Sequence, residues 1–258
     1  MQIRCAVWPR SAKHVRRWGA ALIGLLALGC SDEGHRLGGT EEYAVRGGKK
    51  LGVCAMGADI EIIDQMEDGD GTIEDTARRG GVWFAFNDKT GTQVPTSEDE
   101  TFVMTELDPP RSGSHFAARS YGAGFSKWGA GIGFELLNQK PYDVSSYAGI
   151  TFWARRAPST ASTLRFAMTD IATAPRGGQC REYADYSTCS DYFGADIILG
   201  TAFRRYSFTW AELAQEGWGE PHPASIATSA VYGVRFQTDP VESFDFTIDD
   251  VGLLCHPK

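Results

Sequence analysis

Short segments in which apolar and polar side chains alternate recur along most of this chain. The clearest ones are 116–119, 131–136, 149–155, 164–168, 206–210, 231–236 and 244–248. They are rich in aromatic and β-branched residues, and Gly, Pro, Asp and Ser fill the gaps between them, as is typical of strands joined by turns. Helical candidates are limited to a turn at 142–147 and one or two turns at 210–216 before Gly217. The pattern predicts an all-β chain, a two-sheet antiparallel β-sandwich.

Strand alternation also predicts which side chains leave the core, because successive residues of a strand point to opposite faces. The residues expected to point inward are Ile150, Phe152, Leu164, Phe166, Met168, Val234 and Phe236. Those expected to share one outer surface are Thr151, Trp153, Arg155, Arg165, Thr169, Arg235 and Gln237. An aromatic ring beside guanidinium and amide groups suits sugar recognition, since a sugar stacks on the ring and offers hydroxyls to the polar groups. The alternative is that Arg165 and Arg235 only form cross-strand ion pairs on a solvated face.

Residues 1–29 have the features of a signal peptide. Five basic residues and no acidic one precede the apolar run 18–28, which is too short to span a bilayer permanently. The run ends at Leu26-Ala-Leu-Gly-Cys30, which resembles the lipobox of bacterial lipoproteins. Cys30 is therefore expected to carry lipid and to anchor the chain stably in a membrane. An ordinary secretory signal followed by a chance Cys is the alternative.

Charge and composition then limit the partners of the exported chain. Removing residues 1–29 takes away five of the 25 Lys and Arg residues and none of the 33 Asp and Glu residues, which leaves a net charge of −13. Nucleic acid and anionic lipid surfaces are poor partners for such a chain. Residues 30–53 are polar and dotted with Gly, so they predict a flexible tether before a single domain at 54–258. Ser31 is not the acidic residue described as an inner-membrane retention signal, which favours the outer membrane over the inner one.

The cysteines fit an exported protein. Outside the signal and the lipid anchor the chain has Cys54, Cys180, Cys189 and Cys255. Four cysteines allow three pairings, and spacing alone does not choose between them. We favour 180–189, which flanks a short loop, and 54–255, which joins the two ends of the domain. A zinc site is the alternative, although the chain has no CxxC pair and few His residues.

A series of short motifs follows one order along the domain. The motifs are 63–70 (IDQMEDGD), 81–88 (GVWFAFND), 129–134 (GAGIGF), 142–154 (YDVSSYAGITFWA) and 246–251 (FTIDDV), with cysteine-bearing loop segments at 170–180 and 189–194. This order resembles the galactose-binding-like jelly rolls, and more narrowly family-11 carbohydrate-binding modules and related bacterial exported proteins. The resemblance covers roughly residues 60–253 and implies a galactose-binding-like jelly roll.

The resemblance further implies a non-catalytic glycan-binding module, with a β-glucan-like polysaccharide as the suspected ligand. It also implies a structural calcium ion (Ca²⁺) where the chain enters and leaves the sandwich. The matching carboxylates are Glu67, Asp68 and Asp70 at the entrance and Asp249 and Asp250 at the exit. Of these, Glu67, Asp70 and Asp250 are the expected ligands, because Ca²⁺ prefers hard oxygen atoms. The alternative is that 67–71 is simply a turn.

Charged and aromatic residues crowd the loop that a 180–189 disulfide would make rigid. They are Asp170, Arg176, Tyr183, Tyr186, Asp191 and Tyr192. A loop that is already ordered can select a ligand at lower entropic cost, although it could equally serve stability alone. Together with the outward-facing set, the candidate ligand-binding residues are Trp153, Arg165, Asp170, Asp191, Tyr192, Arg235 and Gln237. Trp218 fits either a platform at the rim or a plug in the core.

The sequence offers little support for catalysis. The segment Gly124-Phe-Ser-Lys-Trp128 lacks the second Gly of a nucleophile elbow, and Glu135 and Glu212 have no reason to face each other as a glycosidase pair. We therefore expect no enzyme activity. Three hypotheses stay open: a surface-tethered glycan-binding lipoprotein, a structural or protein-interaction lipoprotein that binds no glycan, and a glycoside hydrolase.

Overall fold

The structure is a computed structural model that describes residues 45–46, 49–50, 54, 57–97 and 101–257. The predicted signal peptide 1–29, the lipidation site Cys30 and most of the predicted tether 30–53 lie outside the described residues, so they stay predictions. Within the described part of the chain, no helix has the length and hydrophobicity that a membrane crossing requires.

The described residues form antiparallel strands with two short 3-10 segments. The strands are β1 (Val45–Arg46), β2 (Lys49–Lys50), β3 (Ile60–Asp64), β4 (Trp83–Asn87), β5 (Thr92–Val94), β6 (Thr105–Arg111), β7 (Ser114–Ala123), β8 (Ala130–Glu135), β9 (Gly149–Arg156), β10 (Thr163–Asp170), β11 (Phe193–Ile198), β12 (Arg204–Thr209), β13 (Val231–Thr238) and β14 (Ser243–Leu254). The 3-10 segments are η1 (Pro175–Gly177) and η2 (Trp210–Glu212). Every strand predicted from the sequence pattern coincides with one of these strands, and the predicted ends at 136 and 210 run one residue past β8 and β12. This confirms the all-β prediction.

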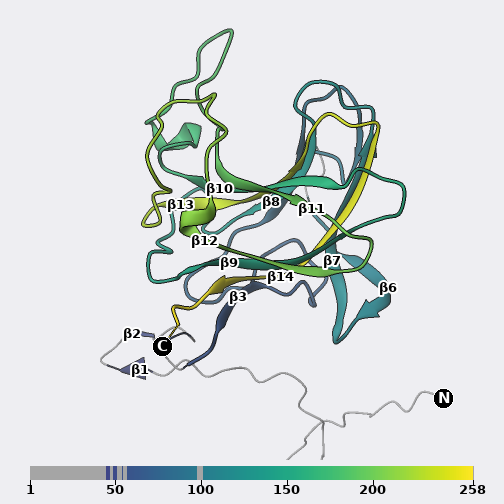
Figure 1. Cartoon of the computed structure of the whole chain (residues 1–258). Helices are drawn as coiled ribbons and strands as arrows, with labels where there is room; N and C mark the ends of the chain where they lie inside the picture. Colours follow the sequence, from purple (N-terminus) through teal and green to yellow (C-terminus); the bar gives the residue numbers. More distant parts are fainter. Residues whose placement is uncertain (1–44, 47–48, 51–53, 55–56, 98–100, 258) are drawn as a thin grey trace, which may run out of the picture. The chain divides into compact units, whose positions relative to one another are not determined.

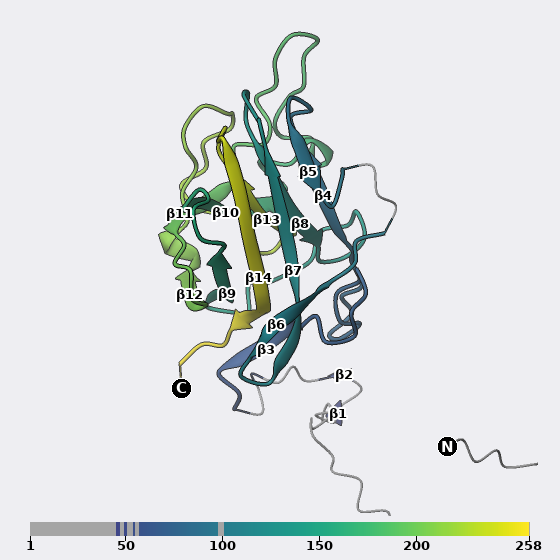
Figure 2. The ribbon, with the colours of Figure 1, turned by 90° about the vertical axis from the view of Figure 1, so that its right-hand side faces the viewer.

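Two sheets make the sandwich. One is five-stranded with the order β11-β10-β13-β8-β4, and the other has the path β12-β9-β14-β7-β5, with β3 added beside β14 and β6 beside β7. Figure 1 shows the sheets as two layers, with β10, β13 and β8 in one and β9, β14 and β7 in the other. Figure 2 looks onto β14 and β7 of the seven-stranded sheet. The predicted two-sheet antiparallel jelly-roll sandwich is therefore confirmed.

The core lies between the two sheets and is built by strand alternation. All seven side chains expected to point inward are fully buried. Phe152 of β9 contacts Phe166 of β10 and Phe236 of β13, with ring centroids 5.1 Å and 4.9 Å away, respectively. Because apolar burial is the largest favourable contribution to folding, these contacts determine how the two sheets face each other.

Both disulfides predicted from the sequence are present. Cys54 pairs with Cys255 and joins the beginning of the domain to the residue that follows β14, and Cys180 pairs with Cys189 in the loop between β10 and β11. The Cys54–Cys255 disulfide joins two residues that are 201 positions apart in the sequence. Such a long closed loop removes much conformational freedom from the unfolded chain and so stabilises the fold. Disulfides of this kind are typical of exported proteins.

The helix predicted at 210–216 is shorter than expected. Only Trp210–Glu212 is helical, and it begins at a capping box in which Thr209 and Glu212 bond each other's backbone. Leu213 returns to extended geometry and is buried, and Ala214 then pairs with Gly194 of β11. Burial of Leu213 and pairing with the edge strand therefore replace the second helical turn.

A buried carboxyl group lies next to the core at the end of β3. Asp64 is 1% exposed and accepts hydrogen bonds from the indole Nε1 of Trp83 at 2.7 Å and from the backbone N–H of Met66 at 2.9 Å. Burial raises the pKa of Asp64 to about 7, with smaller upward contributions from the charges of Asp68 and Glu74, and the two hydrogen bonds only partly offset it.

This raised pKa predicts a pH-dependent stability. Because the folded pKa of Asp64 lies above its unfolded value of 3.8, the free energy of unfolding should fall as pH rises from about 4 to about 7, by an amount on the order of a few kcal/mol. We expect Asp64→Asn to flatten this dependence, although the amide loses one of the two accepted hydrogen bonds and lowers stability at acidic pH. Urea unfolding at a series of pH values measures both effects.

The matched control is Asp185→Asn, at an exposed aspartate of the loop between β10 and β11, which should leave the pH dependence as in the wild type. An unchanged dependence in Asp64→Asn would show that other groups cause it.

Candidate functional site

A groove of about 650 Å³ lies over the outer face of the five-stranded sheet. Side chains from three parts of the chain line it: the strands β4 and β13, the loop before β8, and the loops on either side of β11 and β12. The residues that matter most for its chemistry are Phe86, Trp128, Tyr192, Trp218, Arg235 and Gln237. The groove thus combines four aromatic rings with a guanidinium and an amide.

Trp128 forms one aromatic wall of the groove, and its loop is held in place through the backbone by the carboxylate of Asp88. Oδ2 of Asp88 accepts the backbone N–H groups of Lys127, Trp128 and Gly129, each at 2.9 Å. Burial alone would raise the pKa of Asp88, but these bonds and those from Thr90 hold it well below its ordinary value, so the carboxylate stays ionised. The indole of Trp128 stacks on Phe86 with centroids 6.3 Å apart and remains 46% exposed.

Trp218 is presented from a second loop in the same way. The carboxylate of Asp191 accepts the backbone N–H groups of Glu216, Gly217 and Gly219 at 2.8–3.0 Å. Gly217 has φ +96°, a left-handed conformation that glycine adopts without strain. The side chain of Trp218 is 55% exposed and lines the groove, so it is a rim residue and not a core plug.

Arg235 and Gln237 line the groove from β13, the central strand of the sheet. The guanidinium of Arg235 lies within 4.8–5.2 Å of the ring centroids of Phe84, Phe86 and Tyr192. Nε2 of Gln237 donates to the carbonyl of Trp128 at 2.8 Å, which leaves its amide oxygen available as an acceptor. These two side chains are therefore held in place before any ligand arrives.

A glycine on the neighbouring strand makes room for the aromatic wall. Gly131 of β8 pairs with Phe86 on one side and Gln237 on the other. A Cβ at Gly131 would lie 2.6 Å from Cζ of Phe86. The absence of a side chain at this position thus allows the ring of Phe86 to lie across β8 toward β13.

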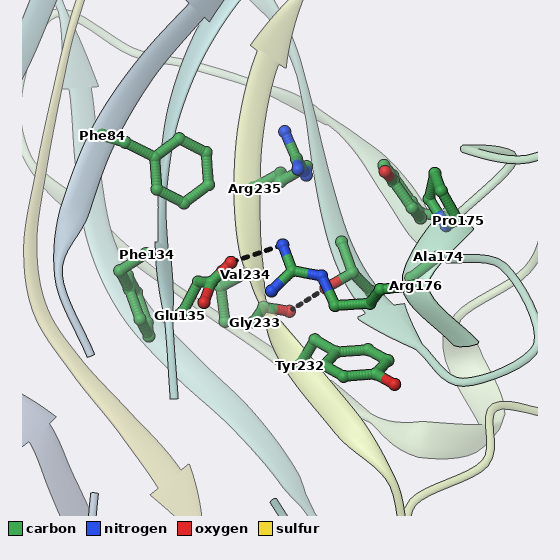
Figure 3. Close-up of a pocket in the computed structure, with 12 residues that line it drawn as sticks. Phe84, Phe134, Glu135, Ala174, Pro175, Arg176, Tyr232, Gly233, Val234 and Arg235 are labelled. Atoms are coloured by element: carbon green, nitrogen blue, oxygen red, sulfur yellow. Dashed lines mark hydrogen bonds and ion pairs between the residues drawn. The ribbon is translucent and has the colours of Figure 1, made fainter. Parts of the chain in front are cut away.

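The segment between β10 and β11 forms the opposite wall and projects from one end of the sandwich (Figure 1). Cys180 and Cys189 close a hairpin at its tip, in which Tyr183 and Tyr186 stack with centroids 4.4 Å apart. Closer to the sheet, Arg176 forms an ion pair with Glu135 and lies over the ring of Tyr232, as Figure 3 shows. The positive charge of Arg176 is thus already compensated.

The expectation of one common outer surface was wrong for Trp153. Trp153 points outward from β9, which belongs to the seven-stranded sheet, whereas Arg235 and Gln237 point outward from the five-stranded sheet. The two surfaces lie on opposite sides of the core. On its own side, the ring centroid of Trp153 lies 4.7 Å from the guanidinium of Arg111. Thr151, on the same strand, is buried and not exposed as predicted, and its hydroxyl donates to the carbonyl of Tyr206.

Asp170 and Asp191 do not line the groove either, and both are buried. Asp170 accepts the backbone N–H groups of Ala172, Thr173 and Ala227, and so holds the beginning of the loop after β10. These two predicted ligand contacts therefore act by positioning loops. Of the remaining predictions, Arg235, Gln237 and Tyr192 do come together in the groove.

Arg165 lies beside the groove and supports its wall. Its Nη1 contacts Asp196 at 3.2 Å, its Nε lies 3.7 Å from Glu216, and Nη2 donates to the carbonyl of Ala214 at 3.0 Å. Arg165 thus links the loop of Trp218 to the edge strand β11. The cross-strand ion pair considered from the sequence is present for Arg165, which pairs with Asp196 on β11. Arg235 forms no such pair with any of the described residues.

Sequence reasoning missed Phe86 and Trp128 as groove residues, and it also missed Phe84, whose ring lies beside the guanidinium of Arg235. Both Phe residues alternate with the inward-facing Trp83 and Ala85 on β4, but all four are apolar, so periodicity could not separate the faces. Trp128 follows no periodic pattern because a loop carries it. The sequence feature that could have indicated the loop of Trp128 is Asp88 together with Gly129, because Asp and Gly both favour tight loops.

Comparison with known proteins supports the fold. No family model and no curated protein matches the sequence. Among solved structures, the family-11 carbohydrate-binding module of the cellulosomal cellulase Lic26A-Cel5E of Clostridium thermocellum aligns with a TM-score of 0.53 at 10% identity, over 77% of this chain and 96% of that one. The chain has the fold of a family-11 carbohydrate-binding module. A second structure of such a module from Clostridium thermocellum, in complex with a β-1,3-1,4-mixed-linked tetrasaccharide, aligns with a TM-score of 0.50 at 12% identity, over 74% of this chain and 98% of that one.

The residues present do not fit the calcium site that the resemblance implies. In the described part of the chain, no group of three or more His, Cys, Asp or Glu side chains is arranged to hold a metal ion. Glu67 accepts the backbone N–H groups of His115 and Phe116, Asp70 accepts that of Thr72, and Asp250 forms an ion pair with Arg111. The expected ligands thus have separate protein partners.

A guanidinium supplies the positive charge at the exit of the sandwich. Nε of Arg111 donates to Oδ2 of the fully buried Asp249 at 2.7 Å, and a terminal nitrogen contacts Asp250. Oδ1 of Asp249 is buried without a partner among the described residues. Burial raises the pKa of Asp249, and the contact with Arg111 opposes this rise.

We expect Arg111→Met to destabilise the fold by about 3 kcal/mol at pH 8, because it leaves the buried Asp249 charge uncompensated. The loss should be smaller at pH 5, since the raised pKa lets a proton neutralise Asp249 as pH falls. Thermal melting at both pH values measures the difference, and Arg205→Met, an exposed arginine on the same face, is the control. Equal melting temperatures for wild type and Arg111→Met at both pH values would contradict this role.

The predicted calcium ion is tested in the same assay by adding calcium to the wild type. A bound structural ion would raise the melting temperature, and an unchanged melting temperature would contradict the predicted ion.

Proposed function

We propose that this protein is a non-catalytic, glycan-binding lipoprotein of the cell envelope, and that the groove on the five-stranded sheet binds the polysaccharide. The observation that carries the proposal is the pair of exposed tryptophans, Trp128 and Trp218, each presented by a loop held on a buried carboxylate. Single exposed apolar side chains are common, but exposed aromatic rings gathered in one groove are typical of a ligand-binding surface. The sandwich supplies the rigid support.

The chemistry of the groove matches a sugar chain. Sugar rings present apolar C–H faces that stack on aromatic rings, and their hydroxyls need planar donors and acceptors nearby. Trp128, Trp218 and Tyr192 provide ring faces, while Arg235 and Gln237 provide donors and an acceptor. Because these groups are already ordered, binding loses little conformational entropy. A β-glucan-like chain is the first probe to use.

The groove offers little for hydrolysis. Among the described residues that line it, Glu182 is the only carboxylate, whereas glycosidases generally use two flanking the scissile bond. This supports a binding role. The predicted signal peptide and Cys30 add a tether, so that the domain would hold polysaccharide close to the cell.

We expect Trp128→Ala and Trp218→Ala each to weaken binding of soluble β-glucans about tenfold or more, because each removes a stacking surface. Affinity electrophoresis of the full chain in gels containing the glucan, with tryptophan fluorescence titration, measures the effect. The matched control is Trp153→Ala on the opposite sheet, which should bind like the wild type after its folding is verified by thermal melting. Loss of binding in Trp153→Ala alone would move the site to the other face, and no binding to any glycan of a panel would end the proposal.

The predicted lipid anchor has its own test. When the full chain is produced in a bacterium with labelled palmitate, the label should enter the protein, and most of it should be found with the membranes. Cys30→Ser should abolish the label and release the protein from the membrane fraction. Retention of the label in Cys30→Ser would show that lipid is attached elsewhere or that the labelling is nonspecific.

A further inference from the structure

The guanidinium of Arg235 is an uncompensated positive charge fixed in the groove. Its central carbon lies 5.1 Å, 4.8 Å and 5.2 Å from the ring centroids of Phe84, Phe86 and Tyr192. Its Nε is buried without a hydrogen-bond partner among the described residues. Three rings favour the cation electrostatically and restrict its motion, but they carry no net charge and do not neutralise it.

Neighbouring arginines differ from Arg235 in this respect. Arg176 is paired with Glu135, and Arg165 is paired with Asp196 at 3.2 Å. In the described part of the chain, no carboxylate lies within ion-pair distance of Arg235. This contrast matters because the chain has a net charge of −8, so carboxylates that could pair with Arg235 are abundant in the sequence.

The position of Arg235 limits which anionic ligands could neutralise its positive charge. Because Nε is buried, only the two terminal nitrogens are available to a ligand, and together they form a planar fork that matches the two oxygens of a carboxylate. One uncompensated charge suits one monovalent anion. A dianionic phosphate would need a second free cation, and the nearby charge of Arg176 is taken by Glu135.

We propose that the groove selects a glycan whose sugar units carry carboxylates, that is, a polysaccharide containing uronic acid, with a carboxylate seated on Arg235. The inference rests on the proposed function and names the ligand class for the same groove. The aromatic rings bind the sugar faces, and Arg235 discriminates between neutral and acidic units. Gln237, two residues along β13, is placed to accept a hydroxyl of the same chain with its free amide oxygen.

The experiment uses a matched pair of ligands that differ only at C6. One is a β-1,4-linked glucose oligomer, and the other is the oligomer of equal length in which each C6 is oxidised to a carboxylate. Isothermal titration of the full chain at low ionic strength should give an affinity about tenfold or more higher for the carboxylated oligomer, as for a charge-assisted hydrogen bond. The preference should shrink as salt is added.

Variants assign the preference to Arg235. Arg235→Met should abolish the preference, so that the two oligomers bind with similar affinity. The affinity for the neutral oligomer falls only by the loss of any hydroxyl contact to the guanidinium, which is smaller than the loss for the carboxylated oligomer. Arg235→Lys should retain part of the preference, because the charge remains but the planar fork is lost. Arg205→Met, on the outer face of the opposite sheet, changes the net charge equally and should keep the preference. Melting temperatures of all variants verify that they are folded.

Each outcome decides between the two proposals. Equal affinity for the two oligomers, or a preference that survives Arg235→Met, would overturn the carboxylate inference while glycan binding through Trp128 and Trp218 still stands. Tighter binding of a sulfated oligomer of the same length than of the carboxylated one would also overturn it. Binding of neither these oligomers nor any other glycan would remove the proposed function and, with it, this inference.

Discussion

The contact between Phe152 of β9 and the pair Phe166 and Phe236 on β10 and β13 determines the geometry of everything outside the core. Strand side chains alternate, so once these rings face each other between the sheets, their sequence neighbours must point away from the core. Trp153 and Arg235 are each next to one of these rings, yet they emerge on opposite surfaces of the sandwich. A change of register in any of the three strands would exchange core and surface residues, which is why the aromatic core holds the groove residues in place.

The loops that carry Trp128 and Trp218 show how segments without regular secondary structure can form a rigid surface. A loop that leaves several backbone N–H groups without partners is unfavourable, and an ionised carboxylate can accept several of them at once. Asp88 and Asp191 each do this for three consecutive or nearly consecutive residues. Their burial makes these bonds stronger than they would be in water, and it also means that replacing either carboxylate would leave several donors unsatisfied. The exposed indoles are therefore ordered by groups that never contact the ligand.

The strands, the core and the disulfides could be predicted because each depends on local periodicity or on position in the chain. The placement of Trp153 could not, since alternation assigns a residue to the inner or outer face of its own sheet and says nothing about which sheet that is. Asp170 and Asp191 were taken for ligand contacts because an aspartate that caps a loop and one that binds a sugar are the same residue type in the sequence. Phe86 was missed because an edge strand with apolar residues on both faces shows no alternation of polarity.

A sandwich of this kind supports many unrelated functions, so the ligand has to be inferred from the groove and not from the fold. Aromatic rings and an amide alone would suit any sugar chain. What distinguishes this groove is that Arg165 beside it and Arg176 in its lining have carboxylate partners, while Arg235 has none among the described residues of an acidic protein. A partly buried charge without a counter-ion lowers the stability of the unliganded fold. Rings around the guanidinium reduce that cost without removing the charge, so a ligand that brings its own carboxylate gains the most from binding there.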